Sequence, residues 1–394
     1  MTKEKKRSSA LTGVILSVVL LALVVFLENS GLVPPTHILF TVLKKGAVYS
    51  LVAVSMNLLN GFTGLFSLGQ AGFMLLGAYT YAILTVPTNV RDSVYYLYGG
   101  SAIHFSLQEL FGSIFGNSGV GGAVSLVLGV LLGLILAGCV AALFAYLIGL
   151  PVLRLKSDYL AIATLGFAEI IRAVFQWQKL GPITNGANMI KSFPTFSSFN
   201  IKSGGKVVLY LSTFVPFLVS ILCIAVIILL INSTYGRAFK AIRDDEVAAE
   251  AMGIDLAHHK MLSFCISSFF AGIGGAMFAM FSNNAQAMPY TSAMTYEILL
   301  IVVIGGIGSI SGSVIGTFLY VACAEWWLFG LDNGRFLFIK APGVFRSGFR
   351  MVVFSVIIMI VVLFFRKGIM GDQELPQKLR GLRARLGKKK EAAK

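Results

Sequence analysis

The sequence predicts an all-α, polytopic integral membrane protein of about 8 to 10 transmembrane helices. Of its 394 residues 57% are apolar and only 12% are charged, against about 45–50% and about 25% in soluble domains. Several apolar runs reach the roughly 20 residues that a membrane-spanning helix needs. The net charge of +15 is concentrated at the chain ends, and ten of the 32 basic residues follow residue 365. This charge pattern is typical of the cytoplasmic flanks of membrane proteins.

The predicted spans begin close to the N-terminus. Residues 10–27 carry no charge, follow the basic stretch MTKEKKRSS and precede no A-x-A cleavage site. We therefore expect a helix that enters the membrane from the cytoplasm rather than a signal peptide. The further apolar runs are residues 37–60, 68–86, 121–150, 159–176, 207–231, 261–281 and 348–365.

A longer apolar block, residues 295–329, is interrupted by GGIGSISGS. Basic residues after positions 231 and 365 place both of these chain segments in the cytoplasm. Counted from a cytoplasmic N-terminus, the crossings then require this block either to cross twice or to dip into the membrane and return. The predicted organisation is a basic tail (1–9), one transmembrane domain (10–365) with a cytoplasmic loop (233–260), and a basic tail (366–394), with both termini cytoplasmic.

Glycine interrupts the hydrophobic segment NLLNGFTGLFSLGQAGFMLLGAY, residues 57–79. A helix broken within lipid leaves backbone groups that protein or water must satisfy, and transporters place substrate beside such breaks. A glycine-rich packing face is an equally compatible interpretation. The candidate residues for a helix break or translocation pathway are Asn57, Gly61, Gly64, Ser67, Gly69, Gln70, Gly305, Gly306 and Gly308.

The loop STYGRAFKAIRDDEVAAEAMGIDLAHHKML, residues 233–262, is the longest cytoplasmic segment between spans. Residues 244–252 are predicted to form a short helix with acidic residues in its first turn and Gly253 at its end. We expect Ala248, Ala249 and Met252 to form an exposed face that docks into a partner's groove. A helix lying on the membrane surface is the alternative.

Motifs for catalysis and metal binding are absent from the sequence. It has no HExxH motif, no usable Ser/His/Asp set and no GxxxxGK[ST] motif, so we expect no enzyme activity and no ATPase site. The four cysteines are scattered singly, and we interpret them as small buried hydrophobic residues, with no metal site. Glu169, Arg172, Glu297 and Glu325 are charged residues within or beside the spans, and we expect structural or interfacial roles for them.

Four segments resemble the permease subunits of ABC importers for branched-chain amino acids, specifically the LivM-type subunit. They are the segment 57–79, LRLKSDYLAIATLGFAEIIR (153–172), GRAFKAIRDDEVAAEAMGI (236–254) and GGIGSISGSVIGTFL (305–319). The third resembles the EAA coupling loop, with Ala248, Ala249 and Gly253 at its alanine and glycine positions and Val247 where the general pattern has glutamate. The coupling residues that this resemblance implies are Gly236, Arg237, Arg243, Glu246, Ala248, Ala249, Glu250 and Gly253.

The resemblance implies a permease that moves leucine, isoleucine and valine into the cytoplasm. Its implied partners are a second related permease, two ABC ATPase subunits that use ATP and Mg²⁺, and an extracytoplasmic substrate-binding protein that approaches the segments 87–119 and 177–206. The chain itself is expected to bind no cofactor and no nucleic acid, and to lie in the bacterial cytoplasmic membrane. The alternatives are an ABC permease for urea or short amides and an ion-coupled secondary transporter, which should have a central intramembrane carboxylate or histidine.

Overall fold

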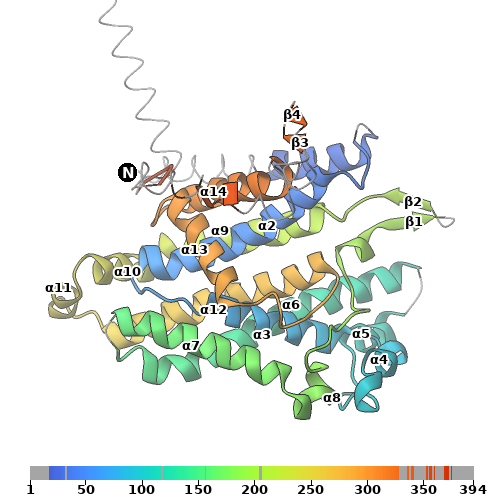
Figure 1. The fold of residues 1–394 in the computed structure, drawn as a ribbon, viewed down its shortest axis with the longest axis horizontal. Coiled ribbons are helices and arrows are strands. Elements are labelled where there is room, and N and C mark those ends of the chain that lie inside the picture. Colours follow the sequence, from blue (N-terminus) through green and yellow to red (C-terminus); the bar gives the residue numbers. More distant parts are fainter. Residues whose placement is uncertain are drawn as a thin grey trace, which may run out of the picture.

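The structure is a computed structural model that describes residues 17–327, except 32, 117, 118, 156, 204 and 205, and short pieces of the remaining C-terminal chain (335–336, 339–340, 352–353, 355–356, 359, 368–371 and 374). The chain forms an elongated bundle of helices (Figure 1).

The longer helices are Ser17–Asn29, α2 (Ile38–Asn57), α3 (Gln70–Thr85), α6 (Gly119–Val152), α7 (Ser157–Gln176), α9 (Phe214–Ile231), α12 (Leu256–Ser282), α13 (Ser292–Gly305) and α14 (Ile310–Ala322). The shorter helices are α4 (Thr88–Val94), α5 (Leu107–Phe115), α8 (Gly181–Thr184), α10 (Thr234–Asp244) and α11 (Glu246–Ala251). π-Helical turns follow α2 and α14 (Leu58–Phe62 and Cys323–Trp327), and 3₁₀ turns occur at Tyr96–Tyr98, Gln178–Leu180 and Phe196–Phe199. Two antiparallel hairpins pair β1 (Ile201–Ser203) with β2 (Lys206–Leu209) and β3 (Arg335–Phe336) with β4 (Ile339–Lys340).

Helices α2 and α12 form the centre of the bundle. In their most apolar stretches 67% of the residues of α2 and 72% of those of α12 are buried, against 39% in α6 and 28% in both α7 and α9. Glycine lets α12 approach its neighbours closely: a Cβ on Gly77 of α3 would lie 1.9 Å from the Gly272 carbonyl oxygen. Small residues at helix crossings are typical of membrane bundles, where van der Waals packing replaces the hydrophobic effect between helices.

The described residues contain five helices long and apolar enough to span a membrane, or six if α13 and α14 together count as one. The predicted all-α membrane fold is therefore confirmed, and the spans at 37–60, 121–150, 159–176 and 261–281 correspond to α2 with its π turn, α6, α7 and α12. The span at 207–231 was placed too early, because hairpin β1–β2 occupies its start and α9 begins at Phe214. Of the predicted helix at 348–365 the structure describes only residues 352–353, 355–356 and 359, which are helical, and residues 10–16 lie outside what it describes.

Helices α13 and α14 form a bent pair in the region of the apolar block 295–329. They are 14 and 13 residues long and are bent by 119° at the break between them. Gly306 (φ 117°) and Gly308 (φ 86°) provide the positive backbone angles of this turn. Gly305 and Gly312 then pack against each other, since a Cβ on either would lie within 2.4 Å of the other's carbonyl oxygen. The glycine-serine centre is therefore a turn between two short helices.

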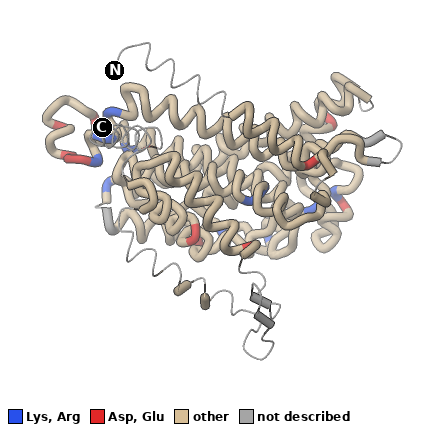
Figure 2. Tube along the Cα trace, turned by 90° about the horizontal axis from the view of Figure 1, so that it is seen from above, with Lys and Arg blue, Asp and Glu red and all other residues tan. Residues whose placement is uncertain are grey.

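The two ends of the bundle differ in structure (Figure 1). Helices α10 and α11 project at one end, and charged residues are frequent in this loop (Figure 2). Helices α4, α5 and α8 and hairpin β1–β2 lie at the opposite end. There the buried Arg91 side chain donates to the Ile83, Val86 and Ile103 carbonyl oxygens at 2.6–2.8 Å and holds the 87–103 segment against α3.

Residues 368–371 and 374 lie at the α13–α14 turn. Ile369 N donates to the Ile304 carbonyl oxygen at 2.8 Å, and Glu374 accepts hydrogen bonds from the backbone of Ile310 and Ser311. Because the same turn also adjoins the α10–α11 loop through Arg243, the loop and the start of the C-terminal tail lie at one end of the bundle. This placement agrees with the charge pattern, which assigns both to one compartment.

Candidate functional site

The helix break between α2 and α3 is closed by groups from other helices. Residues 63–69 are not helical, and Gly64 has a φ of 78°. The freed backbone amides find side-chain acceptors: Leu68 N donates to Thr164 Oγ1 of α7 at 3.0 Å, and Ala71 N donates to Thr295 Oγ1 of α13 at 3.2 Å. The break therefore lies between α7 and α13, and these two backbone amides are satisfied by protein, as lipid requires.

The buried side chain of Asn57 connects this break to the α13–α14 turn. Its Nδ2 donates to the Ser309 carbonyl oxygen at 3.0 Å and to Ser313 Oγ at 2.7 Å, and its Oδ1 accepts from Gly308 N at 2.8 Å. Gly61 has to be glycine at this contact, because a Cβ there would lie 1.9 Å from Asn57 Oδ1 and 2.6 Å from Gly308 N. Two breaks that are about 250 residues apart in sequence thus form one junction.

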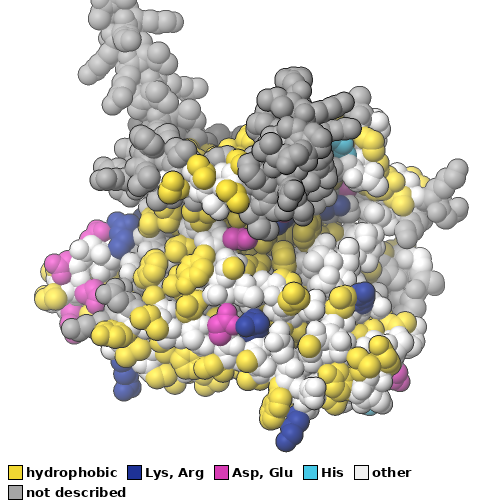
Figure 3. All heavy atoms as spheres, viewed as in Figure 1, with side chains coloured by type: hydrophobic (Ala, Val, Ile, Leu, Met, Phe, Trp, Pro, Cys, Tyr) yellow, Lys and Arg dark blue, Asp and Glu magenta, His cyan; other side chains and the backbone are white. Residues whose placement is uncertain are grey.

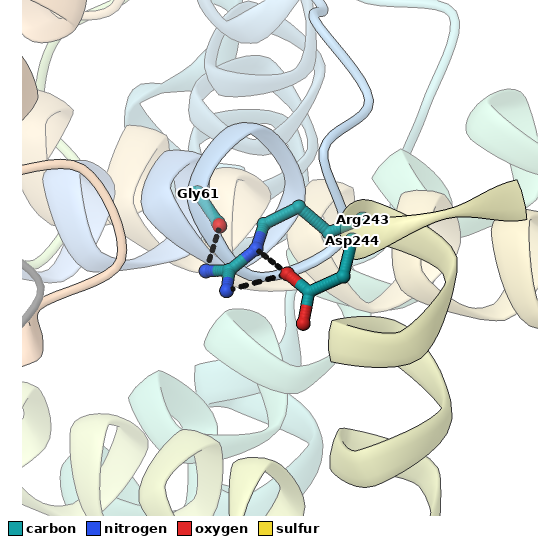
Figure 4. A network of polar contacts seen from close by, with 3 residues as sticks. All are labelled: Gly61, Arg243 and Asp244. Atoms are coloured by element: carbon teal, nitrogen blue, oxygen red, sulfur yellow. Dashed lines mark hydrogen bonds and ion pairs between the residues drawn. The ribbon is translucent and has the colours of Figure 1, made fainter.

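Arg243, near the end of α10, joins the projecting loop to this junction (Figure 4). Its Nη1 donates to the Gly61 carbonyl oxygen at 3.2 Å, while Nε and Nη2 donate to Asp244 Oδ1 at 3.1 and 2.9 Å. A Cβ on Gly64 would lie 3.0 Å from Arg243 Cγ, and one on Gly308 would lie 3.3 Å from Nη1. The guanidinium group therefore lies between the two breaks, and we call Asn57, Gly61, Gly64, Arg243 and Gly308 the Arg243 junction.

The loop itself folds as two helices instead of the single predicted one. Asp244 ends α10, and Asp245 caps α11 by accepting from Val247 N and Ala248 N at 2.9 and 3.0 Å. The helix therefore begins at Glu246 rather than at Asp244. Gly253, with a φ of 84°, follows its end as predicted.

The exposed face of α11 also differs from the prediction. Ala249 is only 4% exposed and packs toward the bundle, so it does not belong to an outward face. The most exposed apolar side chains are Val247 (78%) and Met252 (83%). Glu246 forms an ion pair with Lys260 at 2.7 Å, which ties α11 to α12. The loop thus combines an exposed apolar tip with a buried alanine and an ion pair that contact the bundle.

The other predicted site residues are placed as follows. Gly236 is buried where α10 turns away from α9, and a Cβ there would lie 2.1 Å from the Ile231 carbonyl oxygen. Arg237, Ala248 and Glu250 are exposed on the loop. Around the α2–α3 break, Ser67 N donates to Asn60 Oδ1, Gly69 packs against Thr164, and Gln70 Nε2 donates to Ser55 Oγ at 2.7 Å. The structure thus brings Arg243 together with the break residues, which the sequence had placed in separate groups.

Two ion pairs flank α13 on the bundle. On α7, Arg172 Nε and Nη2 both lie 2.7 Å from Glu169 Oε2, and Glu169 Oε1 accepts from Ser292 N of α13 at 3.1 Å. In the second pair, Lys45 of α2 contacts Glu325 in the π turn after α14. Sequence patterns gave no means of finding the Lys45–Glu325 contact, because it joins residues 280 positions apart.

The cysteine interpretation needs one correction. Cys139, on α6, is exposed at the bundle surface, and Cys223, Cys265 and Cys323 are partly buried. A cysteine in the middle of a span can face lipid as readily as a leucine can, because lipid tails are themselves apolar and give apolar side chains no reason to be buried in protein. The expectation of a buried residue is therefore wrong at Cys139.

These features define the class of the protein: it is a polytopic α-helical membrane protein with a broken helix, a bent helical pair and a structured loop at one end. A family model for the branched-chain amino acid transport system permease component matches residues 38–365. The chain belongs to this family.

Relatives of known name agree with the family match. The chain is 32% identical over 301 residues to the high-affinity branched-chain amino acid transport system permease protein LivM of Salmonella typhimurium and to that of Escherichia coli, covering 71% of this chain and 61% of each relative. It thus spans about three-fifths of the length of these relatives. It is also 26% identical over 286 residues to the probable LivM of Methanocaldococcus jannaschii, covering 70% of this chain and 76% of that protein. No solved structure shows significant similarity.

Proposed function

We propose that this chain is the membrane subunit of an ATP-driven importer that moves branched-chain amino acids into the cytoplasm. The family match and the names of its relatives support the substrate class. The sequence carries no P-loop motif, so ATP would be hydrolysed with Mg²⁺ by two partner ATPase subunits. The other proposed partners are a second related permease and an extracytoplasmic binding protein at the end of the bundle that holds α4, α5 and α8.

The single observation that carries this proposal is the Arg243 junction. The tip of α11 presents Val247 and Met252, an apolar pair suited to a groove on an ATPase subunit. When that subunit moves, the ion pair of Glu246 with Lys260 passes the displacement to α12. Arg243 passes it to the α2–α3 break and the α13–α14 turn, where helices are already interrupted.

The energetics follow from linkage. ATP can change which side of the membrane is open only if ATP-bound partners bind the loop more tightly in one arrangement of the bundle than in the other. Helix breaks suit such a change because a few backbone angles can alter there without disrupting long helices. The Arg243 junction is therefore the place where we expect the two arrangements to differ.

The test is copurification followed by transport. The tagged chain, extracted gently from its native host, should carry two P-loop ATPases and a second permease, and the complex in liposomes should take up leucine only with ATP and the binding protein. Val247→Asp should reduce ATPase copurification, because it would place a carboxylate in an apolar contact. Leu155→Asp is the matched control, since Leu155 is a 46% exposed residue in the α6–α7 link at the same end of the bundle.

Three results would contradict the proposal. Recovery of the chain alone, with ATP-independent leucine uptake along an ion gradient, would favour a secondary transporter. Uptake of urea but not leucine would move the substrate to short amides. Normal ATPase recovery with Val247→Asp would show that α11 is not the docking element.

A further inference from the structure

The ion pair of Glu169 and Arg172 lies well inside the span of α7. Glu169 is seven residues from the end of the helix at Gln176, which corresponds to about 10 Å at 1.5 Å per residue. Exposed Trp177, with Lys179 over its ring, marks the adjoining interface.

Arg172 is directed into the membrane rather than toward the interface. Side chains on a helix lean toward its N-terminus, and the α7 N-terminus lies at the end of the bundle that carries α10 and α11. The pairing of Arg172 with Glu169, three residues earlier, fixes this direction, and Glu169 is itself held by Ser292 N. An arginine that only snorkelled would extend toward Trp177 instead.

Both side chains are nevertheless open to the surroundings of the chain. The relative exposure is 30% for the Arg172 side chain and 36% for that of Glu169. The face over α7 and α13 shows isolated charged side chains among hydrophobic and small ones (Figure 3). Charged groups at this depth are costly against lipid tails, so they occur where protein or a water-filled path covers them. This face adjoins the α2–α3 break through Thr164 and Thr295.

We propose that Glu169 and Arg172 form a contact site for the charged ends of the amino acid on its way through the membrane. The inference rests on the proposed function and adds the residues that recognise the zwitterion. The pair uses Nε and one Nη2 hydrogen of Arg172, which leaves guanidinium N–H groups for a carboxylate in the fork geometry that arginine favours. Glu169 oxygens have further lone pairs for the ammonium group. Opposite charges 2.7 Å apart therefore match a solute that carries both signs on one carbon.

Paired glutamine variants separate this role from a merely structural one. Glu169→Gln with Arg172→Gln leaves an amide at each position, with an acceptor for Ser292 N, and removes both charges; residue 172 becomes shorter. We expect the complete complex with this double variant to assemble and to hydrolyse ATP when the loaded binding protein is added. Leucine uptake should nevertheless fall roughly tenfold or more, the cost of losing charged hydrogen bonds. Uptake at the wild-type rate in the double variant would overturn the inference.

Cysteine labelling keeps the test decisive if the double variant does not assemble. With the native cysteines replaced, Ala173→Cys puts a thiol on the exposed side of α7 beside Arg172. A hydrophilic maleimide should label it in the working complex, and leucine with the loaded binding protein should slow the labelling. A chain that keeps only the native Cys139, exposed on α6, is the control and should stay unlabelled. No labelling of the Ala173→Cys variant in any nucleotide state would also overturn the inference.

The failure of this inference can be told apart from failure of the proposed function. If the wild-type complex does not take up leucine with ATP, the proposed function is wrong, and the pair has no solute to contact. If the wild-type complex does transport leucine and the double glutamine variant matches it, only the role of Glu169 and Arg172 is wrong.

Discussion

Replacing Asn57 by alanine should weaken the contact between the α2–α3 break and the α13–α14 turn. The substitution removes the donated hydrogen bonds to the Ser309 carbonyl oxygen and Ser313 Oγ, a longer one of 3.5 Å to the Gly306 carbonyl oxygen, and the one accepted from Gly308 N. Each is worth about 1 kcal/mol net, and somewhat less in membrane proteins, where measured values average about 0.6 kcal/mol. The Ser309 carbonyl still accepts from Ser313 N, so Gly308 N–H is the group that loses its partner. We expect a loss of about 2–3 kcal/mol in the free energy of unfolding.

The assay is unfolding by SDS in mixed micelles, followed by helix content. Asn232→Ala is the matched control because Asn232 is exposed and bonds only within the end of its own helix; it should change the free energy of unfolding by less than about 0.5 kcal/mol. Asn57→Asp should be at least as damaging as Asn57→Ala, since it keeps the acceptor for Gly308 N but turns a carboxylate toward the Ser309 carbonyl oxygen. A loss below about 0.5 kcal/mol for Asn57→Ala would refute the view that this side chain holds the two breaks together.

Three further predictions concern packing, the segment 87–103 and an intramembrane ion pair. Gly77→Ala should destabilise the bundle by several kcal/mol, because its Cβ would lie 1.9 Å from a carbonyl oxygen of α12. Gly166→Ala, within α7 and with nothing within 4 Å, should be neutral or slightly stabilising in the same SDS assay. Arg91→Gln should increase protease cleavage within residues 87–103 while the helical core remains intact, since the shorter side chain cannot reach all three carbonyl oxygens; unchanged cleavage would count against the clamp. Lys45→Met should lower the melting temperature because it leaves Glu325 unpaired. Adding Glu325→Gln should restore part of this loss. A double variant that melts no higher than the single variant would show that the two residues are not coupled.

The helical spans and their interruptions could be predicted from the sequence because they depend on local composition. Apolar length specified α2, α6, α7 and α12, and glycine at positions such as 64, 306 and 308 marked the breaks, where the structure has positive φ angles. The predicted start of α9 is wrong because Val207 and Val208 are as compatible with a β-strand as with a membrane span. In the structure both residues belong to β2, which pairs with β1.

The site depends on contacts between distant residues, which composition does not reveal. Arg243 bonds to a carbonyl 182 positions earlier, and Asn57 bonds to a turn about 250 positions later. The burial of Ala249 could not be predicted from the sequence either. An Ala-Ala pair on a six-residue helix has no hydrophobic pattern that distinguishes the buried from the exposed alanine. The sequence therefore named the participants of the Arg243 junction but not the fact that they meet.

The central claim is that Arg243 transmits movement of the loop to the helix breaks. The most direct measurement is the number of leucine molecules transported per ATP hydrolysed by the reconstituted complex carrying Arg243→Ala. Arg154→Ala is the control, because Arg154 is an exposed arginine in the α6–α7 link at the same end of the bundle. We expect Arg243→Ala to assemble and to hydrolyse ATP while this ratio falls severalfold, and Arg154→Ala to keep the wild-type ratio. An unchanged ratio with Arg243→Ala would contradict the account.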